Sequence, residues 1–509
     1  MIVGGGHNGL VSAAYLARAG LSCVVLERRA AVGGAAVSEA AFGGLDVRVS
    51  RFAYLVSLLP RRIVDELGLD VRLVRRPVSS YTPDPRAGCE RGLLVDGRDP
   101  RATRASFARV TRDERQFDDW QRLQATLGRF ARRVFPTLLD PLRSRAGLRA
   151  VAGDDAMWEA IVERPLAGLV EEASGDDLVR GVMLTDALIG TFAAAGDPTL
   201  RQNRCFLHHV IGGGTGDWDV PVGGMGAITA ALLDAALGAG AHVRTGVEAT
   251  AVGDGEVRLR RQDGGEESIG ARWILANVAP AELDRLRGRA PAARLAEGSQ
   301  LKVNLLLSRL PRLRDPHVCA ADAFAGTFHV NESYEQLQRA YAAAAGGLIP
   351  EPAPCEAYCH TLSDPSILGA DLAAAGAHTL TVFGLHMPAR LFDADPGAAR
   401  DVALRSTLSS LDGVLGEPIA DCIMRDPHGE PCIDVHTPAD LERELRMPRG
   451  NIFHGDLDWP FADEPDDIGR WGVETDDPRI LICGSGARRG GAVSGIPGRN
   501  AAMAVLAGS

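Results

Sequence analysis

Three glycines near the start of the chain have the spacing of a loop that binds phosphate. They form the pattern Gly4-x-Gly6-x-x-Gly9, which follows a short apolar run and precedes a stretch with helical periodicity. The first glycine permits a tight turn, the second lets the backbone approach a pyrophosphate, and the third lets helix and strand pack closely. Unpaired amides at the helix start favour a negative group. We therefore predict a dinucleotide site that also includes His7 and Asn8.

An acidic residue follows where the ribose of a dinucleotide would lie. Glu27 ends the next apolar run, 18 residues after Gly9. A carboxylate at this place accepts hydrogen bonds from an adenosine ribose and repels a 2′-phosphate, which disfavours NADP. Arg28 and Arg29 argue the other way, because an arginine accommodates that phosphate. We weight the carboxylate more heavily and expect Arg28 to lie at the cofactor.

A second glycine pair favours FAD over NAD. It consists of Gly33 and Gly34, followed by Ala35 and Ala36, just beyond the acidic residue. Small residues let the backbone come close to the remainder of an extended dinucleotide. We predict FAD as the cofactor and place these four residues in its site.

The last segment of the chain has a further glycine-rich loop between an apolar run and a helix. A loop that leads into a helix N-terminus suits the electron-rich end of an isoalloxazine ring, because the helix dipole stabilises negative charge on the reduced ring. The cofactor-binding residues predicted in this loop are Gly484, Ser485, Gly491, Val493, Ser494, Gly495 and Ile496.

Histidines are the first candidates for proton transfer, because imidazole titrates near neutral pH. We name His208, His209 and His454 as catalytic candidates, ahead of His329 and His360. The alternative for each of them, and the commoner case, is an ordinary hydrogen-bonded histidine of the core or the surface.

Two neighbouring cations, Arg488 and Arg489, precede the last glycines. They leave three alternatives open: they stabilise an anionic reduced flavin, they bind an anionic substrate, or they point to solvent. We include Arg488 among the catalytic candidates.

The elements that must position these residues follow from periodicity and breakers. The start of the chain has strand–helix–strand order. Helical spacing dominates about 113–197, with apolar faces that either pack a helical subdomain or line a substrate tunnel. A helix to Leu237 then leads into a strand and a β-meander, whose later strands we place at 258–261 and 272–276. The remaining predicted elements are strands at 1–3, 23–26, near 243, 302–307, 379–385 and 480–483, and helices at 10–19 and from about 498.

These elements predict an α/β protein with two intertwined domains. A Rossmann-like FAD-binding domain is assembled from the discontinuous segments 1–60, 215–280 and 445–509. A substrate or cap domain with a mixed sheet and helices takes 61–214 and 281–444. A chain of 509 residues exceeds the size at which one hydrophobic core stops growing, which agrees with two domains.

Composition excludes several classes of function. The formal charge of −11 argues against nucleic-acid binding, which needs a basic face. Nine cysteines, an odd number, argue against a disulfide framework and favour a reducing cytoplasm. The pair Cys355 and Cys359 lacks further ligands at matching spacing, so we predict no metal. We expect no membrane span, although peripheral membrane contact stays open, and the oligomeric state is not predicted.

The whole chain resembles the phytoene desaturase-like branch of the flavin amine oxidase superfamily, and most closely the group of pyridine nucleotide-disulfide oxidoreductase domain-containing protein 2. Beyond the two glycine loops, the motifs that carry this resemblance are Leu207-His208-His209, Gly223-Gly224-Met225-Gly226-Ala227, Thr437-Pro438-Ala439-Asp440-Leu441-Glu442, Asn451-Ile452-Phe453-His454-Gly455 and Gly495-Ile496-Pro497-Gly498-Arg499-Asn500.

The resemblance implies FAD held without a covalent bond and a second domain that roofs the flavin. It also implies that Val247 contacts the adenine end, and that the substrate is a largely apolar small molecule. One departure is Arg488-Arg489-Gly490-Gly491-Ala492-Val493, where the family has His-Pro-Gly-Gly-Gly-Val. This departure puts the family's general substrate in doubt.

The leading hypothesis is an oxidoreductase, a dehydrogenase or desaturase that passes a hydride from its substrate to flavin N5. A redox-neutral isomerase that uses reduced FAD is the alternative, and a flavin-binding protein without turnover is a third. A disulfide reductase is excluded, because no cysteine follows Cys23 until Cys89 and the required redox pair is missing.

Overall fold

A five-stranded parallel sheet joins segments from both ends and the middle of the chain. The computed structural model describes residues 1–290 and 295–508. All four strand pairings in this sheet are parallel. Across the sheet the order is β19 (Ile480–Ile482), β13 (Ile274–Ala276), β1 (Ile2–Val3), β2 (Val24–Leu26) and β9 (His242–Arg244). The predicted dinucleotide-binding architecture is confirmed.

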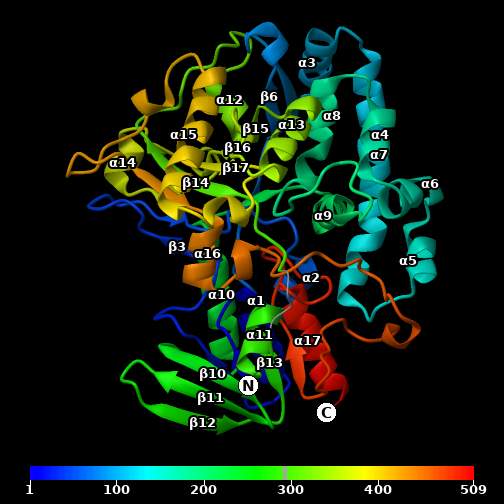
Figure 1. Cartoon of the computed structure of the whole chain (residues 1–509), viewed down its shortest axis with the longest axis vertical. Helices are drawn as coiled ribbons and strands as arrows, with labels where there is room; N and C mark the ends of the chain where they lie inside the picture. The colour runs from blue at the N-terminus through cyan, green and yellow to red at the C-terminus, as the bar shows by residue number, and fades with distance from the viewer. Residues whose placement is uncertain (291–294, 509) are drawn as a thin grey trace.

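Three helices cover this sheet and bring the chain ends together. They are α1 (His7–Arg18), α10 (Met225–Gly238) and α17 (Ile496–Ala507). The central helix α1 packs against both of the others, and the two termini lie near each other at one end of the molecule (Figure 1). Alanine and glycine are frequent in these helices, so their backbones approach closely.

One predicted strand belongs to a different sheet from the one we assigned it to. We expect 272–276 to be a late strand of the meander, and this is wrong, because β13 pairs with β1 and β19. Its continuous apolar run is typical of a parallel strand buried on both faces. The meander itself consists of β10 (Val247–Gly253), β11 (Glu256–Arg261) and β12 (Glu266–Gly270).

A seven-stranded mixed sheet forms the second part of the molecule. Six strand pairs make it up, and all are antiparallel except that between β15 and β6. Its order is β18 (Ile433–His436), β14 (Leu301–Leu307), β17 (His378–Gly384), β16 (Cys355–Tyr358), β15 (Thr327–Val330), β6 (Val78–Pro83) and β7 (Gly92–Asp96). Strand β14 is buried at every position, which fits its place inside the sheet.

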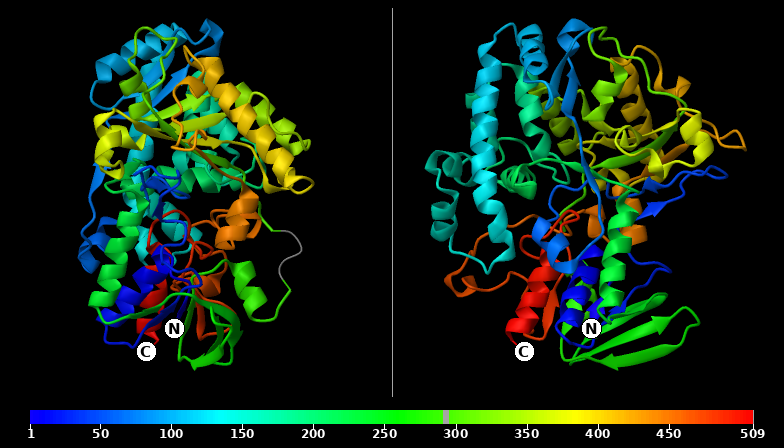
Figure 2. Two further views of the ribbon diagram at one scale, coloured as in Figure 1. Left: turned by 90° about the vertical axis from the view of Figure 1, so that its left-hand side faces the viewer. Right: turned by 180° about the vertical axis from the view of Figure 1, so that it is seen from behind.

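A helical region flanks the mixed sheet, and both lie at the end of the molecule opposite the meander (Figure 2). Helices extend on both sides of the predicted stretch 113–197. They are α3 (Pro100–Thr111), α4 (Arg115–Val134), α5 (Arg145–Ala152), α6 (Asp155–Trp158), α7 (Leu166–Ala173), α8 (Asp177–Leu184) and α9 (Arg201–Val210). The apolar faces of α4 and α7 pack into a buried cluster shared with the parallel-sheet domain.

Shorter elements connect these parts. The remaining helices are α2 (Arg61–Leu67), α11 (Pro280–Leu286), α12 (Ala320–Ala325), α13 (Tyr334–Ala345), α14 (Ala370–Ala374), α15 (Pro396–Val414) and α16 (Pro438–Leu445). The remaining strands are β3 (Ser38–Glu39), β4 (Val49–Ser50), β5 (Leu73–Arg75) and β8 (Asp219–Pro221). In the described part of the chain, no helix combines the length and the apolar character that a membrane span requires.

Candidate functional site

A cavity of about 300 Å³ is lined by residues of both the parallel sheet and the mixed sheet, and we call it the main cavity. It joins segments that are hundreds of residues apart in the sequence. The predicted site residues that line it are Gly4, Gly6, His7, Asn8, Glu27, Arg28, Gly34, Ala35, His209, Val247, His454, Ser485 and Val493.

The other predicted cofactor residues lie behind the cavity wall and shape it. A Cβ atom on Gly9 would overlap the carbonyl oxygen of Gly4, so only glycine lets α1 meet its strand. A Cβ atom on Gly491 would lie 2.8 Å from the Phe453 ring. The residues that do not line the cavity are Gly9, Gly33, Ala36, Gly484, Gly491, Ser494, Gly495 and Ile496.

The Glu27 carboxylate is held against the glycine loop. Its two oxygens accept hydrogen bonds from the backbone amides of Gly5 at 2.8 Å and Arg29 at 2.7 Å. The residue is 8% exposed and lines the cavity. A carboxylate accepts several hydrogen bonds, so it has capacity left for the hydroxyl groups of a ribose.

The start of α1 offers polar groups that fit a phosphate-bearing cofactor. Gly6 precedes the helix and provides no side-chain cap, which leaves the first amides of the helix available. Two buried atoms beside them, His7 Nε2 and Asn8 Oδ1, have no hydrogen-bond partner among the described residues. Burial lowers the pKa of His7 to about 4, so its ring is neutral at physiological pH.

The second glycine pair packs directly on the first loop. The Gly33 amide donates a 2.9 Å hydrogen bond to the Gly5 carbonyl, and a Cβ atom on Gly34 would lie 3.3 Å from the Cα atom of Gly6. Both Gly33 and Gly34 have positive φ angles, which glycine adopts without strain. The three cofactor motifs therefore lie around one cavity, and the arrangement fits an extended dinucleotide.

The three histidine candidates occupy different positions. The Nδ1 atom of His209 lies 2.9 Å from the Asp186 carbonyl oxygen, so Nδ1 carries the hydrogen and Nε2 has the free lone pair. Burial lowers the pKa of His209 and of His454 to about 4. His208 does not line the main cavity; its ring lies against Gly491 and Phe453. Burial, with His209 beside it, lowers the pKa of His208 as well.

The two arginines of the last loop support neighbouring loops instead of lining the cavity. Arg488 forms an ion pair with Asp463 and donates to the Phe461 carbonyl oxygen at 2.9 Å. Arg489 is 6% exposed and donates to three backbone carbonyl groups. These contacts indicate a supporting role for both side chains, which none of the three alternatives left open by the sequence includes. Their partners lie in segments that the sequence pattern did not connect with this loop.

Lys302 is a residue that the sequence patterns did not identify. It lies in β14, lines the main cavity, and its Nζ atom donates to the carbonyl oxygens of Ser50 at 2.6 Å and Phe52 at 2.8 Å. Burial lowers the pKa of Lys302 to about 7. The sequence contains one indication: Lys302 is its only lysine, and arginine is the residue at every other permanently cationic side chain.

Aromatic residues and one acid of the mixed sheet complete the wall. Tyr54 and Phe383 lie on either side of the lysine, at 5.9 Å and 5.4 Å from its Nζ atom to their ring centres. Glu356 accepts a hydrogen bond from the Tyr358 hydroxyl, and burial raises the pKa of Glu356 to about 8. No short motif surrounds these residues, because the sheet brings them together from separate strands.

Comparisons with known proteins agree with this site. A family model described as an NAD(P)-binding Rossmann-like domain matches residues 2–61. The chain is 52% identical to an uncharacterized protein of Mycobacterium tuberculosis, over 100% of this chain and 96% of that protein. It is 30% identical to pyridine nucleotide-disulfide oxidoreductase domain-containing protein 2 of Rattus norvegicus, over 99% of this chain and 93% of the relative.

Solved structures with the same fold include two amine oxidases. A triple mutant of putrescine oxidase matches with a TM-score of 0.60 and 17% identity, over 100% of this chain and 98% of that chain. Cyclohexylamine oxidase from Brevibacterium oxydans matches with a TM-score of 0.54 and 15% identity, over 100% and 99%. Together with the relatives and the cavity, the shared fold identifies FAD as the cofactor and oxidoreduction as the class of activity.

Proposed function

The chain belongs to the family of pyridine nucleotide-disulfide oxidoreductase domain-containing protein 2, and we propose that it is an FAD-dependent dehydrogenase of a largely apolar small molecule. One observation carries the proposal. The main cavity is lined by the glycine loops and also by an aromatic wall of six residues, Phe52, Tyr54, Trp218, Tyr358, Phe383 and Phe453.

FAD supplies the redox chemistry when bound, because its ring accepts an electron pair together with a hydrogen from a substrate carbon. The chain's own residues supply orientation, exclusion of water and proton transfer. The aromatic wall holds an apolar molecule and keeps water away from it. Arg488 and Arg489 do not line the cavity, so the structure gives no reason to expect that they bind an anionic substrate there.

Lys302 is one proposed proton carrier in the main cavity, which it lines. An amine with a pKa near 7 exists in both protonation states at neutral pH, so it donates or accepts a proton with little cost. His209 is neutral, and its free Nε2 lone pair is a second acceptor. We retain His454 as a further candidate, whereas His208 and Arg488 lose that role because they do not line the cavity.

The cofactor-binding role of the loop residues and a non-covalent attachment of FAD are tested on the purified protein. We expect a yellow protein that releases FAD on acid precipitation and leaves a colourless pellet. A yellow pellet would indicate a covalent bond. Glu27 and the α1 amides are the proposed contacts of the adenosine and pyrophosphate parts, and Ser485 and Val493 those of the ring end.

Substrate class and reaction type are tested together. Apolar alkenes, alcohols and amines are mixed anaerobically with the holoenzyme while the absorbance of bound FAD is followed. Bleaching by an apolar compound, with stoichiometric formation of an oxidised product, supports the dehydrogenase. Turnover without any electron acceptor and without net oxidation supports the isomerase instead. Binding of apolar compounds without either result would indicate a flavin-binding protein without turnover.

A further inference from the structure

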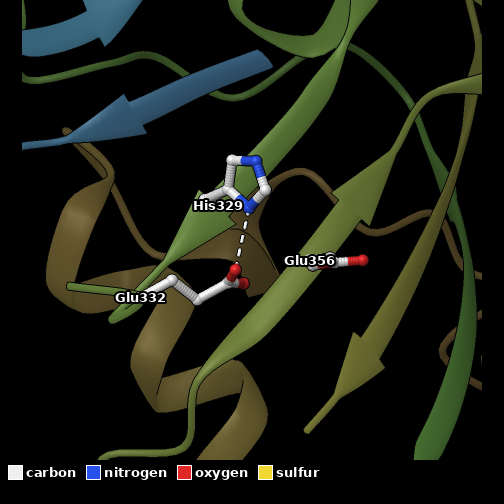
Figure 3. Close-up of side chains that lie close together, drawn as sticks. All are labelled: His329, Glu332 and Glu356. Atoms are coloured by element: carbon white, nitrogen blue, oxygen red, sulfur yellow. Dashed lines mark hydrogen bonds and ion pairs between the residues drawn. The ribbon is translucent and has the colours of Figure 1, made fainter. Parts of the chain in front are cut away.

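Three buried titratable side chains lie together beside the main cavity. His329 in β15 and Glu356 in β16 are direct cross-strand partners, and Glu332 follows the end of β15. Figure 3 shows the Glu332 carboxylate turned toward the His329 ring, with the second ring nitrogen on the far side. The Glu332 Oε2 and His329 Nδ1 atoms are 2.8 Å apart. Each of the three residues is 1% exposed.

This cluster lies between two cavities. Glu356 lines the main cavity. His329 lines a second cavity of about 260 Å³, which lies between the helical region and the mixed sheet. Exposed residues, among them Arg75 and Gln124, form part of the rim of the second cavity, so it reaches the surface. Tyr358 contributes to both walls, together with Ile189 and Trp218.

The atoms in the cluster are placed for a proton to move along it. One nitrogen or oxygen of each side chain lies within 4.8 Å of one from each of the others. In addition, Glu332 Oε1 and Glu356 Oε1 are buried without a hydrogen-bond partner among the described residues. A buried polar oxygen without a partner costs free energy, so its persistence needs an explanation. A side-chain rotation or one water molecule is enough to connect the two carboxyl groups.

We propose that Glu356, Glu332 and His329 form a proton relay that connects the main cavity with solvent through the second cavity. The inference rests on the proposed dehydrogenation. A substrate that loses two electrons and two hydrogens gives one hydrogen with the electron pair to FAD, and a double bond forms in the product. The second hydrogen leaves as a proton to one oxygen of Glu356 while the proton on the other oxygen passes to Glu332. Glu332 passes its own proton to His329 Nδ1, and the proton on His329 Nε2 leaves through the second cavity.

The surroundings keep the relay close to neutral. Burial raises the pKa of Glu332 well above its usual range and lowers the pKa of His329 to about 4. Because the acids and the imidazole are neutral, a concerted shift, in which one proton enters at Glu356 as another leaves from His329, produces no separated charges in a medium of low dielectric constant. The titratable and charged groups that face the cluster from neighbouring elements are Arg76, Asp186, Cys205, Cys355 and Tyr358.

A divalent cation and a purely structural cluster are the competing explanations. One histidine and two glutamates are suitable ligands for a metal ion. The 2.8 Å contact between Nδ1 and Oε2 is, however, the length of a hydrogen bond, with a proton between the two atoms. A structural cluster would leave both Oε1 atoms unexplained, and it would not have to reach both cavities.

The test uses the holoenzyme and needs no substrate. Bound FAD is photoreduced with EDTA as the electron donor, and reduction takes up at least one proton from water. Proton uptake is followed with an indicator dye from about pH 6 to about pH 9. We expect uptake to slow at least about tenfold in Glu356→Gln and also in Glu332→Gln and His329→Asn. His360→Asn, which removes a buried histidine–carboxylate contact outside both cavity walls, is the matched control.

A second measurement on the unaltered protein does not depend on any variant. Glutamate labelled with carbon-13 should give an infrared band of buried carboxylic acid that disappears as the pH rises through about 8, the pKa of Glu356. Unchanged uptake in Glu356→Gln, equal slowing in His360→Asn, absence of the infrared band, or a stoichiometric divalent metal in the purified protein would each overturn the relay. If no apolar compound reduces FAD but these results hold, the relay stands and the proposed reaction fails.

Discussion

The hydroxyl group of Ser12 in α1 donates a 2.8 Å hydrogen bond to the carbonyl oxygen of Gly498 in α17, 486 residues later in the chain. A side chain on Gly498 has no room, because its Cβ atom would overlap the carbonyl oxygen of Asn8. The first and last helices therefore pack backbone to backbone beside the glycine loop. This contact is how the end of the chain completes the cofactor cavity.

Gly498→Ala tests the helix contact. We expect a loss of about 3 kcal/mol in the free energy of unfolding, because the backbone must shift to relieve the overlap. We also expect less FAD per protein after purification. Denaturant unfolding and the absorbance ratio of flavin to protein measure the two effects. The control is Gly168→Ala in α7, where a Cβ atom meets nothing within 4 Å and the change should stabilise by about 0.5–1 kcal/mol.

Glu27→Gln tests the acidic residue at the ribose end. An amide has one acceptor oxygen, so it satisfies only one of the two backbone amides that Glu27 now accepts from. FAD should bind about tenfold more weakly, a loss of about 1.4 kcal/mol. Titration of the apoprotein with FAD, followed by flavin fluorescence, gives the dissociation constant. Equal affinity for the variant would remove Glu27 from the binding site. Glu267→Gln, at a surface ion pair with Arg244, should leave the affinity unchanged.

The pKa of Lys302 is directly measurable because the chain has no other lysine. Reductive methylation with carbon-13 formaldehyde should give two signals, one from Lys302 and one from the N-terminus. We expect the Lys302 signal to titrate at about 7 in the folded protein, since burial disfavours the ammonium form. A value near the 10.5 of a free lysine would contradict the buried position.

The lowered pKa of Lys302 should also make the stability of the protein depend on pH, and Lys302→Met tests this. Below the folded pKa of about 7, both folded and unfolded chains are protonated, and the folded chain bears the full cost of a buried charge. Between about 7 and 10.5 only the unfolded chain binds the proton, so the cost fades as the pH rises. The melting temperature of the variant should therefore exceed that of the parent protein by the most at acidic pH and by the least near pH 10.5. A gain that does not change with pH would exclude an ionised lysine as its cause.

Arg489→Ala should reduce stability without changing proton transfer. Its guanidinium donates to the carbonyl oxygens of Thr137, Asp140 and Trp471. Removing it leaves the part-buried carbonyl groups of Asp140 and Trp471 without this donor, whereas that of Thr137 keeps the Asp140 amide. We expect a loss of about 2–4 kcal/mol, seen as a lower melting temperature. The dependence of FAD photoreduction on pH should stay as it is. Arg101→Ala, at an exposed position of α3, should change the melting temperature by little.

The cofactor half of the site could be predicted because its signals are local. Gly4, Glu27 and Gly33 each act through a backbone conformation or a position at a strand end, and those depend on a few neighbouring residues. The register of β1 with β13 was not predictable in this way. No turn in the sequence assigns residues 272–276 to the meander or to the parallel sheet. Their pairing therefore depends on which sheet has room for an apolar strand.

The rest of the cavity wall was predictable only in small part. His209 and His454 line the cavity, but Glu356, Tyr358 and Lys302 carry no motif, and His329 was only a weak candidate. The lone lysine was the one signal in the sequence that could have identified a wall residue. Arg488 stands next to a cofactor motif but does not line the cavity, because adjacency in a loop does not decide which side of the loop a side chain occupies.

The sequence by itself determined the fold class, the cofactor and the backbone loops that hold it, since glycine spacing and strand ends impose those features over short distances. Only the tertiary structure decided which side chains meet around the cavity and in the cluster of His329, Glu332 and Glu356. The pKa values of these groups depend on burial and on neighbours from other strands, and neither is a property of any one stretch of chain.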